Sequence, residues 1–80
     1  EPVSSETTAT LFPNPVSDLL YVRTREKIES VELYTSTGML VYACQECLVM
    51  NLSHLPTGCY HVRIKFKTGI TSIHRLIVKV

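Results

Sequence analysis

Three cysteines and three histidines are the residues of this 80-residue chain best suited to metal or redox chemistry. Cys44 and Cys47 have the Cys-x-x-Cys spacing of a zinc or redox pair. A structural zinc site needs four ligands in tetrahedral geometry, and neither Cys59 nor the histidines form a second close pair. A thioredoxin-like motif would precede a helix, and no helix is predicted. We therefore expect no metal and no cofactor. The sequence leaves open whether Cys44 and Cys47 form a local disulfide or remain reduced.

Acid–base and nucleophilic chemistry have few candidates. His61 and His74 lie within residues 59–80, a region without Asp or Glu, so a Ser-His-acid triad has no acid there. The two histidines are candidates to meet across the last hairpin, in a register that the sequence does not fix. Three acids elsewhere in the chain are expected to be solvated strand and loop residues rather than an acid–base pair: Glu29, Glu32 and Glu46. We predict that the chain is not an enzyme.

Acidic and basic residues are nearly equal in number, but they are unevenly distributed along the chain. Residues 1–58 hold three Lys and Arg against all seven acids, a net charge of −4, whereas residues 59–80 hold five and no acid, a net charge of +5. This asymmetry indicates either an acidic partner or a solvated face whose lysines protect a sheet edge. Nucleic acid is not expected as a partner, because no aromatic series interleaves with the basic residues and no helix is predicted.

Length and composition indicate one small folded domain. Hydrophobic residues make up 45% of the chain and charged residues 19%, a balance that excludes intrinsic disorder. No apolar run approaches the roughly 20 residues that span a bilayer. Because the chain begins with neither Met nor a signal peptide, we expect a domain cut from a longer protein. Residues 1–10, rich in Ser and Thr, are expected to be its linker.

Short strands separated by turns are predicted along residues 11–80. The clearest alternation places Tyr60, Val62, Ile64 and Phe66 on one face and basic side chains on the other, as in an antiparallel strand over a core. Turn residues recur every eight to twelve positions. We predict an all-β fold, an Ig-like antiparallel β-sandwich of about seven short strands.

The corner before this strand supports the same fold. Residues 55–60, Leu-Pro-Thr-Gly-Cys-Tyr, place a proline turn just before a strand that opens with Tyr60. Sandwiches often place a tyrosine at such a corner, with its hydroxyl bonded to backbone a few residues upstream. We therefore predict a structural role for Tyr60.

Four blocks of sequence also follow one another in a fixed order. They comprise residues 11–16 (LFPNPV), 31–42 (VELYTSTGMLVY), 50–60 (MNLSHLPTGCY) and 75–80 (RLIVKV). Their turn and corner residues are Pro13, Asn14, Pro15, Gly38, Gly58 and Tyr60. In this order the chain resembles the type A C-terminal sorting domain of the type IX (Por) secretion system, found in Gram-negative bacteria of the Bacteroidetes group.

The resemblance implies a secretion signal. In that family, residues 11–80 would form the sorting domain and residues 1–10 the linker from upstream cargo. Cargo enters the periplasm, the outer-membrane translocon recognises the folded domain, and the cargo crosses. A surface sortase usually cleaves upstream of the domain, and the cargo is released or joined to anionic lipopolysaccharide. The expected location is the periplasm in transit, then the cell surface or the medium. The sequence leaves open whether the domain is cleaved or retained.

The last two strands are the expected recognition surface. We predict that the translocon reads their basic face together with the edge of the final strand, because charge complementarity speeds encounter and strand addition gives directional bonds. The predicted recognition residues are Arg63, Lys65, Lys67, Arg75, Leu76, Ile77, Val78, Lys79 and Val80.

Two other functions and one assembly state remain as alternatives. A non-catalytic Ig-like module could bind carbohydrate or a host protein for an upstream hydrolase. Such a module needs exposed aromatic rings, and Tyr21, Tyr34 and Tyr42 are predicted on separate strands. A retained structural part of the surface attachment machinery is the other function. Exposed strand edges also predict a homodimer by edge pairing.

Overall fold

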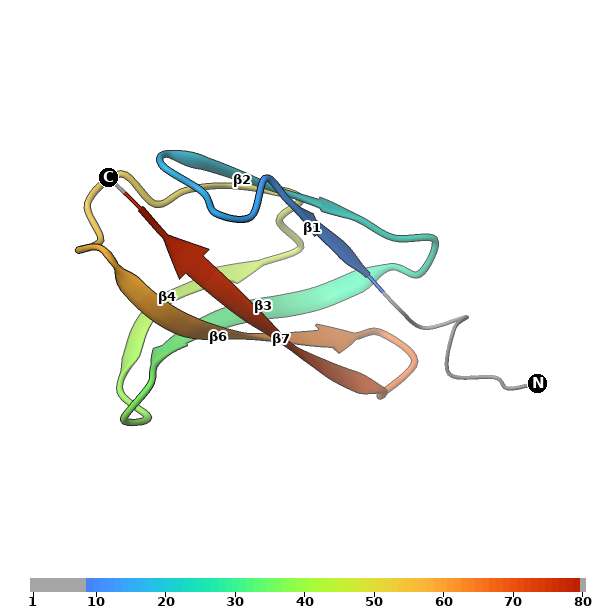
Figure 1. The fold of residues 1–80 in the computed structure, drawn as a ribbon. Helices are drawn as coiled ribbons and strands as arrows, with labels where there is room; N and C mark the ends of the chain where they lie inside the picture. Colours follow the sequence, from blue (N-terminus) through green and yellow to red (C-terminus); the bar gives the residue numbers. More distant parts are fainter. Residues whose placement is uncertain (1–8, 80) are drawn as a thin grey trace.

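Seven strands in two facing sheets make up the part of the chain that the structure describes, residues 9–79 of a computed structural model (Figure 1). The strands are β1 (Thr10–Phe12), β2 (Leu19–Arg23), β3 (Ile28–Thr35), β4 (Leu40–Gln45), β5 (Val49–Asn51), β6 (Gly58–Phe66) and β7 (Thr71–Val78). The smaller sheet has the order β1-β2-β5 and the larger one β4-β3-β6-β7, and neighbours pair antiparallel. The predicted all-β sandwich is confirmed. Among residues 9–79, no helix is long and apolar enough to cross a membrane.

The alternation of β6 decides which face of the larger sheet is buried. Tyr60, Val62, Ile64 and Phe66 are at most 6% exposed, while the side chains between them face solvent. Successive side chains of a strand point to opposite faces, so a period of two produces one apolar and one polar face. The sequence pattern therefore fixes the orientation of this strand, and β6 pairs with β3 on one side and β7 on the other.

The core lies between the two sheets and is apolar throughout. Side chains that are fully buried come from both sheets and from the loops between them, and they are Val16, Leu20, Val31, Leu33, Met50, Leu52, Val62, Ile64, Phe66, Leu76 and Val78. No polar or charged side chain of the described residues is buried. Burial of apolar surface is thus the main force that holds the sheets together.

Tyr60 at the start of β6 and Gly38 in the β3–β4 turn each make a local contact that the sequence blocks indicated. The hydroxyl of Tyr60 donates a hydrogen bond of 2.6 Å to the carbonyl oxygen of Pro56, the contact that a tyrosine corner makes. Gly38 closes the β3–β4 turn with a φ of +98°, a left-handed conformation that favours glycine. Its N–H donates to the carbonyl oxygen of Thr35.

The loop between β4 and β5 is closed by a disulfide. The sulfurs of Cys44 and Cys47 are bonded, and their Cα atoms lie 5.9 Å apart. Between them Glu46 has a φ of +57° and donates its backbone N–H to the carbonyl oxygen of Glu29. Cys59 is a free, exposed thiol on β6.

The predicted linker falls largely outside the described residues. Residues 1–8 lie outside them, as does Val80. Within them, Ala9 is 4% exposed and packs in the core, and Thr10 begins β1. The folded unit therefore includes residues 9 and 10.

Candidate docking surface on the last strand

The final strand lies at one edge of the larger sheet. β7 pairs with β6 along its whole length, from Lys65 opposite Thr71 to Gly58 opposite Val78. Its other side has no full strand beside it in the described part of the chain. An edge strand presents a row of backbone N–H and C=O groups that another chain can pair with.

The predicted basic face of β6 is largely neutralised. Arg63 lies 3.9 Å from a carboxylate oxygen of Glu32, and Lys65 lies 3.9 Å from one of Glu29. Both acids come from β3, which pairs with β6 and places Glu32 directly opposite Arg63. These are exposed ion pairs, worth about 0–1 kcal/mol each, so they cancel charge more than they add stability.

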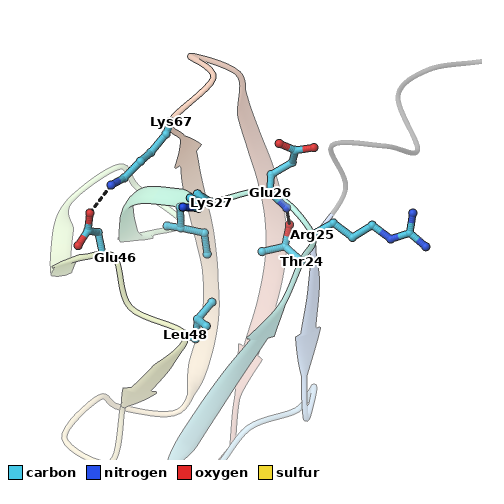
Figure 2. A pocket seen from close by; sticks show the side chains of 8 residues that line it. Thr24, Arg25, Glu26, Lys27, Glu46, Leu48 and Lys67 are labelled. Carbon is cyan, nitrogen blue, oxygen red and sulfur yellow. Dashed lines mark hydrogen bonds and ion pairs between the residues drawn. The ribbon is translucent and has the colours of Figure 1, made fainter.

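Lys67 also has an acidic partner, from a different element. Its ammonium group pairs with the carboxylate of Glu46 in the disulfide-closed loop, as Figure 2 shows. The hydrogen bond and charge of Lys67 lower the pKa of Glu46, and those of Glu46 raise the pKa of Lys67. Three of the predicted recognition cations therefore have acidic neighbours that residues 59–80 alone do not contain.

Arg75 and Lys79 differ from these three cations in their surroundings. Both are exposed, and in the described chain neither makes an ion pair. Arg75 lies opposite His61 rather than opposite an acid. The unpaired positive charge of the larger sheet is therefore concentrated along β7 and just beyond its end.

The apolar residues of the predicted recognition set divide between core and surface. Leu76 and Val78 are fully buried, whereas Ile77 is 40% exposed. Val80 lies outside the described residues. Leu76 and Val78 hold β7 on the core, so only the backbone and the odd-numbered side chains of this strand are available to a partner.

Residues 14–16 cover one half of the β7 edge, and we call them the edge cap. The side-chain oxygen of Asn14 accepts a hydrogen bond of 3.1 Å from Ile77 N–H, and its side-chain nitrogen donates one of 3.3 Å to the carbonyl oxygen of Arg75. Val16 N–H donates to the carbonyl oxygen of Ile77, and Lys79 N–H donates to that of Val16, both at 2.9 Å. The edge cap pairs with β7 as a short parallel strand would. Pro13 and Pro15 flank Asn14 in sequence and are exposed.

Beside the open half of β7, the outer face of the larger sheet carries a hollow of about 490 Å³. It is lined by Tyr34, His61, Arg63 and Ile73 and by residues 35–38, which form the end of β3 and the turn that follows it. The hydroxyl of Tyr34 donates to Glu32 over 2.8 Å, and this contact raises the pKa of Tyr34. The carboxylate of Glu32 therefore lies between the hydroxyl of Tyr34 and the guanidinium of Arg63.

A second hollow, of about 420 Å³, lies between the β2–β3 turn, the β4–β5 loop and the end of β6. Figure 2 shows Lys67 turned toward Glu46 at one side of this hollow and Arg25 extended away from it. Lys27 also helps to lower the pKa of Glu46. Because its charges are engaged with one another or directed outward, this hollow offers no convergent set of groups for chemistry.

His61 and His74 do not form a site together. His61 is exposed on the outer face opposite Arg75, whereas His74 pairs with the buried Val62 and faces inward. Ser72 Oγ and His74 Nε2 lie 3.0 Å apart, and burial lowers the pKa of His74. Residues 9–79 contain no group of three or more His, Cys, Asp or Glu that could hold a metal ion.

The structure also brings together two aromatic rings that the sequence did not. Phe12 on β1 lies opposite Tyr21 on β2, and the rings stack with centroids 5.6 Å apart. The guanidinium of Arg23 lies 5.7 Å from the centre of the Phe12 ring. The sequence did not indicate this contact because it depends on the pairing of β1 with β2, and the Pro-Asn-Pro segment separates Phe12 from Tyr21 along the chain.

A search of curated proteins found no match to the chain. A family model described as the secretion system C-terminal sorting domain matches residues 10–79, nearly the whole chain. Its boundaries agree with the folded unit seen here, which includes Thr10 and ends after β7. The chain belongs to the family of C-terminal sorting domains of the type IX secretion system.

Proposed function

We propose that the domain sorts its cargo by presenting β7 to the type IX translocon. Membership of the family makes it a C-terminal sorting signal that interacts with the type IX machinery and leads to export, to the surface or the medium. The observation that carries the proposal is that β7 is an edge strand, and that Arg75 on it and Lys79 just beyond its end make no ion pair within residues 9–79. Charge of this kind steers a partner and selects among partners.

The other predicted residues have supporting roles in this proposal. Arg63, Lys65 and Lys67 hold acids of β3 and of the disulfide loop at the sheet surface. Leu76 and Val78 fix β7 in the core, and Ile77 exposes part of its side chain beside the edge cap. Val80 completes the proposed recognition segment.

The proposal includes the route of the cargo. The cargo passes through the periplasm of a Gram-negative bacterium, crosses the outer membrane, and is cut by a surface sortase upstream of the domain. The domain itself has no catalytic role and binds no cofactor. Mass spectrometry of the exported protein tests the cleavage: cargo without residues 11–80 supports it, and cargo that retains them assigns the domain to the surface attachment machinery.

A fusion of residues 1–80 to a periplasmic reporter tests the sorting function. In a bacterium with a type IX secretion system, we expect the fusion in the medium or on the surface and the bare reporter in the periplasm. Equal periplasmic retention of both would contradict the proposal.

One observation favours a second candidate, a non-catalytic carbohydrate-binding module. Phe12, Tyr21 and Arg23 form an aromatic and cationic cluster on the outer face of the smaller sheet, with Phe12 40% exposed. Retention of the same fusion on immobilised glycans, without export, would support this module. A homodimer by pairing of a strand edge other than that of β7, such as the edge of β4, is also proposed, and sedimentation of the fusion tests it.

A further inference from the structure

The edge cap divides the β7 edge into an occupied and an open half. Residues 75, 77 and 79 direct backbone groups away from β6, since these groups bond Asn14 and Val16. Backbone groups of an antiparallel strand alternate between its two sides, so residues 71 and 73 direct theirs to the same edge. In the described chain no backbone partner reaches the edge groups of Thr71 and Ile73 or the N–H of Arg75.

The open half also carries the most exposed large apolar side chain of the described residues. Ile73 is 68% exposed, and Ile70 at the preceding turn is 46% exposed. Ile73 lines the hollow on the outer face together with His61 and Arg63. Unpaired backbone, an exposed β-branched residue and an adjoining hollow thus coincide at one place, as in sites of strand addition.

Charge indicates what kind of strand fits there. Beyond Glu46 the sequence contains no Asp or Glu, and Arg75 and Lys79 on the β7 side have no ion pairs among residues 9–79. A second copy of this chain would present the same cations on its own β7, so it offers no complementary charge. An extended segment with apolar and acidic residues would satisfy both Ile73 and Arg75.

We propose that an extended, acidic segment of the translocon adds to β7 at residues 71–75, and that the edge cap sets where this pairing stops. The inference rests on the proposed function and narrows it, because the covered half of the edge is excluded from strand pairing. Asn14 and Val16 are positioning residues in this arrangement: they occupy the backbone groups that would otherwise allow the partner to slide toward the end of β7.

Proline at position 73 tests the pairing without disturbing the sheet. The N–H of Ile73 faces the open edge, so Ile73→Pro removes a docking donor and leaves the β6–β7 ladder intact, as edge prolines do. Ile73→Ala is the matched control, since it shortens the side chain and keeps the N–H. Thr71→Pro and Thr71→Ala form a second pair, because Thr71 begins the strand and its N–H faces the same way.

The readout is the exported fraction of the reporter fusion, with circular dichroism to show that each variant is folded. We expect Ile73→Pro to reduce export by up to about tenfold, the upper end of the effect of losing one backbone hydrogen bond, and Ile73→Ala to reduce it less. Thr71→Pro takes the place of Ile73→Pro should the latter unfold.

Three results would overturn the inference. Folded proline variants exported as well as the unmodified fusion would exclude strand addition at residues 71–75. An equal loss in Ile73→Ala and Ile73→Pro would assign the role to the side chain alone. A fusion dimer that Ile73→Pro converts to monomer with unchanged export would assign the edge to a second copy. If the unmodified fusion itself is not exported, the proposed function fails, a separate outcome.

Discussion

The side chain of Asn14 forms the hydrogen bonds to the edge of β7 that a neighbouring strand would otherwise form. Its amide has the donor and the acceptor of a peptide group, and it uses both on β7, at Arg75 and Ile77. The segment between two prolines thereby protects an edge that would otherwise pair with other chains. This gives a physical role to the first sequence block of the family.

Replacement of Asn14 by alanine should therefore destabilise the domain. Asn14→Ala loses two hydrogen bonds, each worth about 0.5–1.5 kcal/mol net, so we expect the free energy of unfolding to fall by about 1–3 kcal/mol. Asn14→Asp keeps the acceptor for Ile77 N–H but turns a carboxylate oxygen toward the carbonyl oxygen of Arg75, so it should not recover the stability of the unmodified domain. Urea denaturation measures both, and an alanine variant as stable as the unmodified domain would contradict the role of the edge cap.

The role of Asn14 could not be derived from its position in the sequence. The Pro-Asn-Pro segment predicts extended or turning backbone, because each proline restricts its own φ and the residue before it. The partner strand lies more than sixty residues further along the chain. Tyr60 was more accessible to sequence reasoning, since its partner Pro56 is only four residues away.

For the strands, the sequence predicted which face is buried better than it predicted which strands lie side by side. The alternation of β6 predicted which side chains face the core, because burial enforces a period of two. It did not predict that β3 would place Glu29 and Glu32 beside Lys65 and Arg63. Cross-strand pairing depends on the order of strands in the sheet, which the pattern of one strand does not contain.

The β4–β5 loop provides a test of the disulfide. The bond between Cys44 and Cys47 closes a very short loop, with a sequence separation of 3, and chain-entropy arguments give such a loop a stabilisation of about 2 kcal/mol. We expect reduction, or the double change Cys44→Ala and Cys47→Ala, to lower the free energy of unfolding by about that amount. Denaturation with and without reductant checks this, with Cys59→Ala as the control. No difference between the two conditions would contradict a stabilising bond.

The pair of Glu46 and Lys67 predicts a pH dependence in the acid range. Lys67 lowers the pKa of Glu46 in the folded state, so the pair contributes stability above the unfolded pKa of about 4.3 and loses it as the pH falls through the folded pKa. The stability difference between the unmodified domain and Glu46→Gln should therefore shrink as the pH is lowered from neutral to about 3. Thermal unfolding across this range measures it. A difference that stays constant with pH would show that the pair is not formed.

For the whole molecule, folding redistributes the charge that the sequence separates. The region of residues 59–80 has a net charge of +5, yet the sheet sets β3 and the disulfide loop against it. Of the five cations in this region, the two that make no ion pair among residues 9–79 are Arg75 on β7 and Lys79 just beyond its end, beside an edge that is half covered by the edge cap and half open. Membership of the family does not by itself reveal this arrangement. The number of Lys and Arg residues in residues 59–80 overestimates the basic surface, because three of them have acidic partners.

Export of a reporter fusion in which the cations at positions 75 and 79 are reversed tests whether β7 and the residue after it are what the translocon recognises. We compare Arg75→Glu combined with Lys79→Glu against Arg25→Glu, an exposed cation at the β2–β3 turn that makes no ion pair in the described chain. Both variants change side chains outside the core, so both should fold. We predict that the double reversal leaves most of the reporter in the periplasm, with export reduced about tenfold, while Arg25→Glu is exported normally. Normal export of the folded double variant would contradict it.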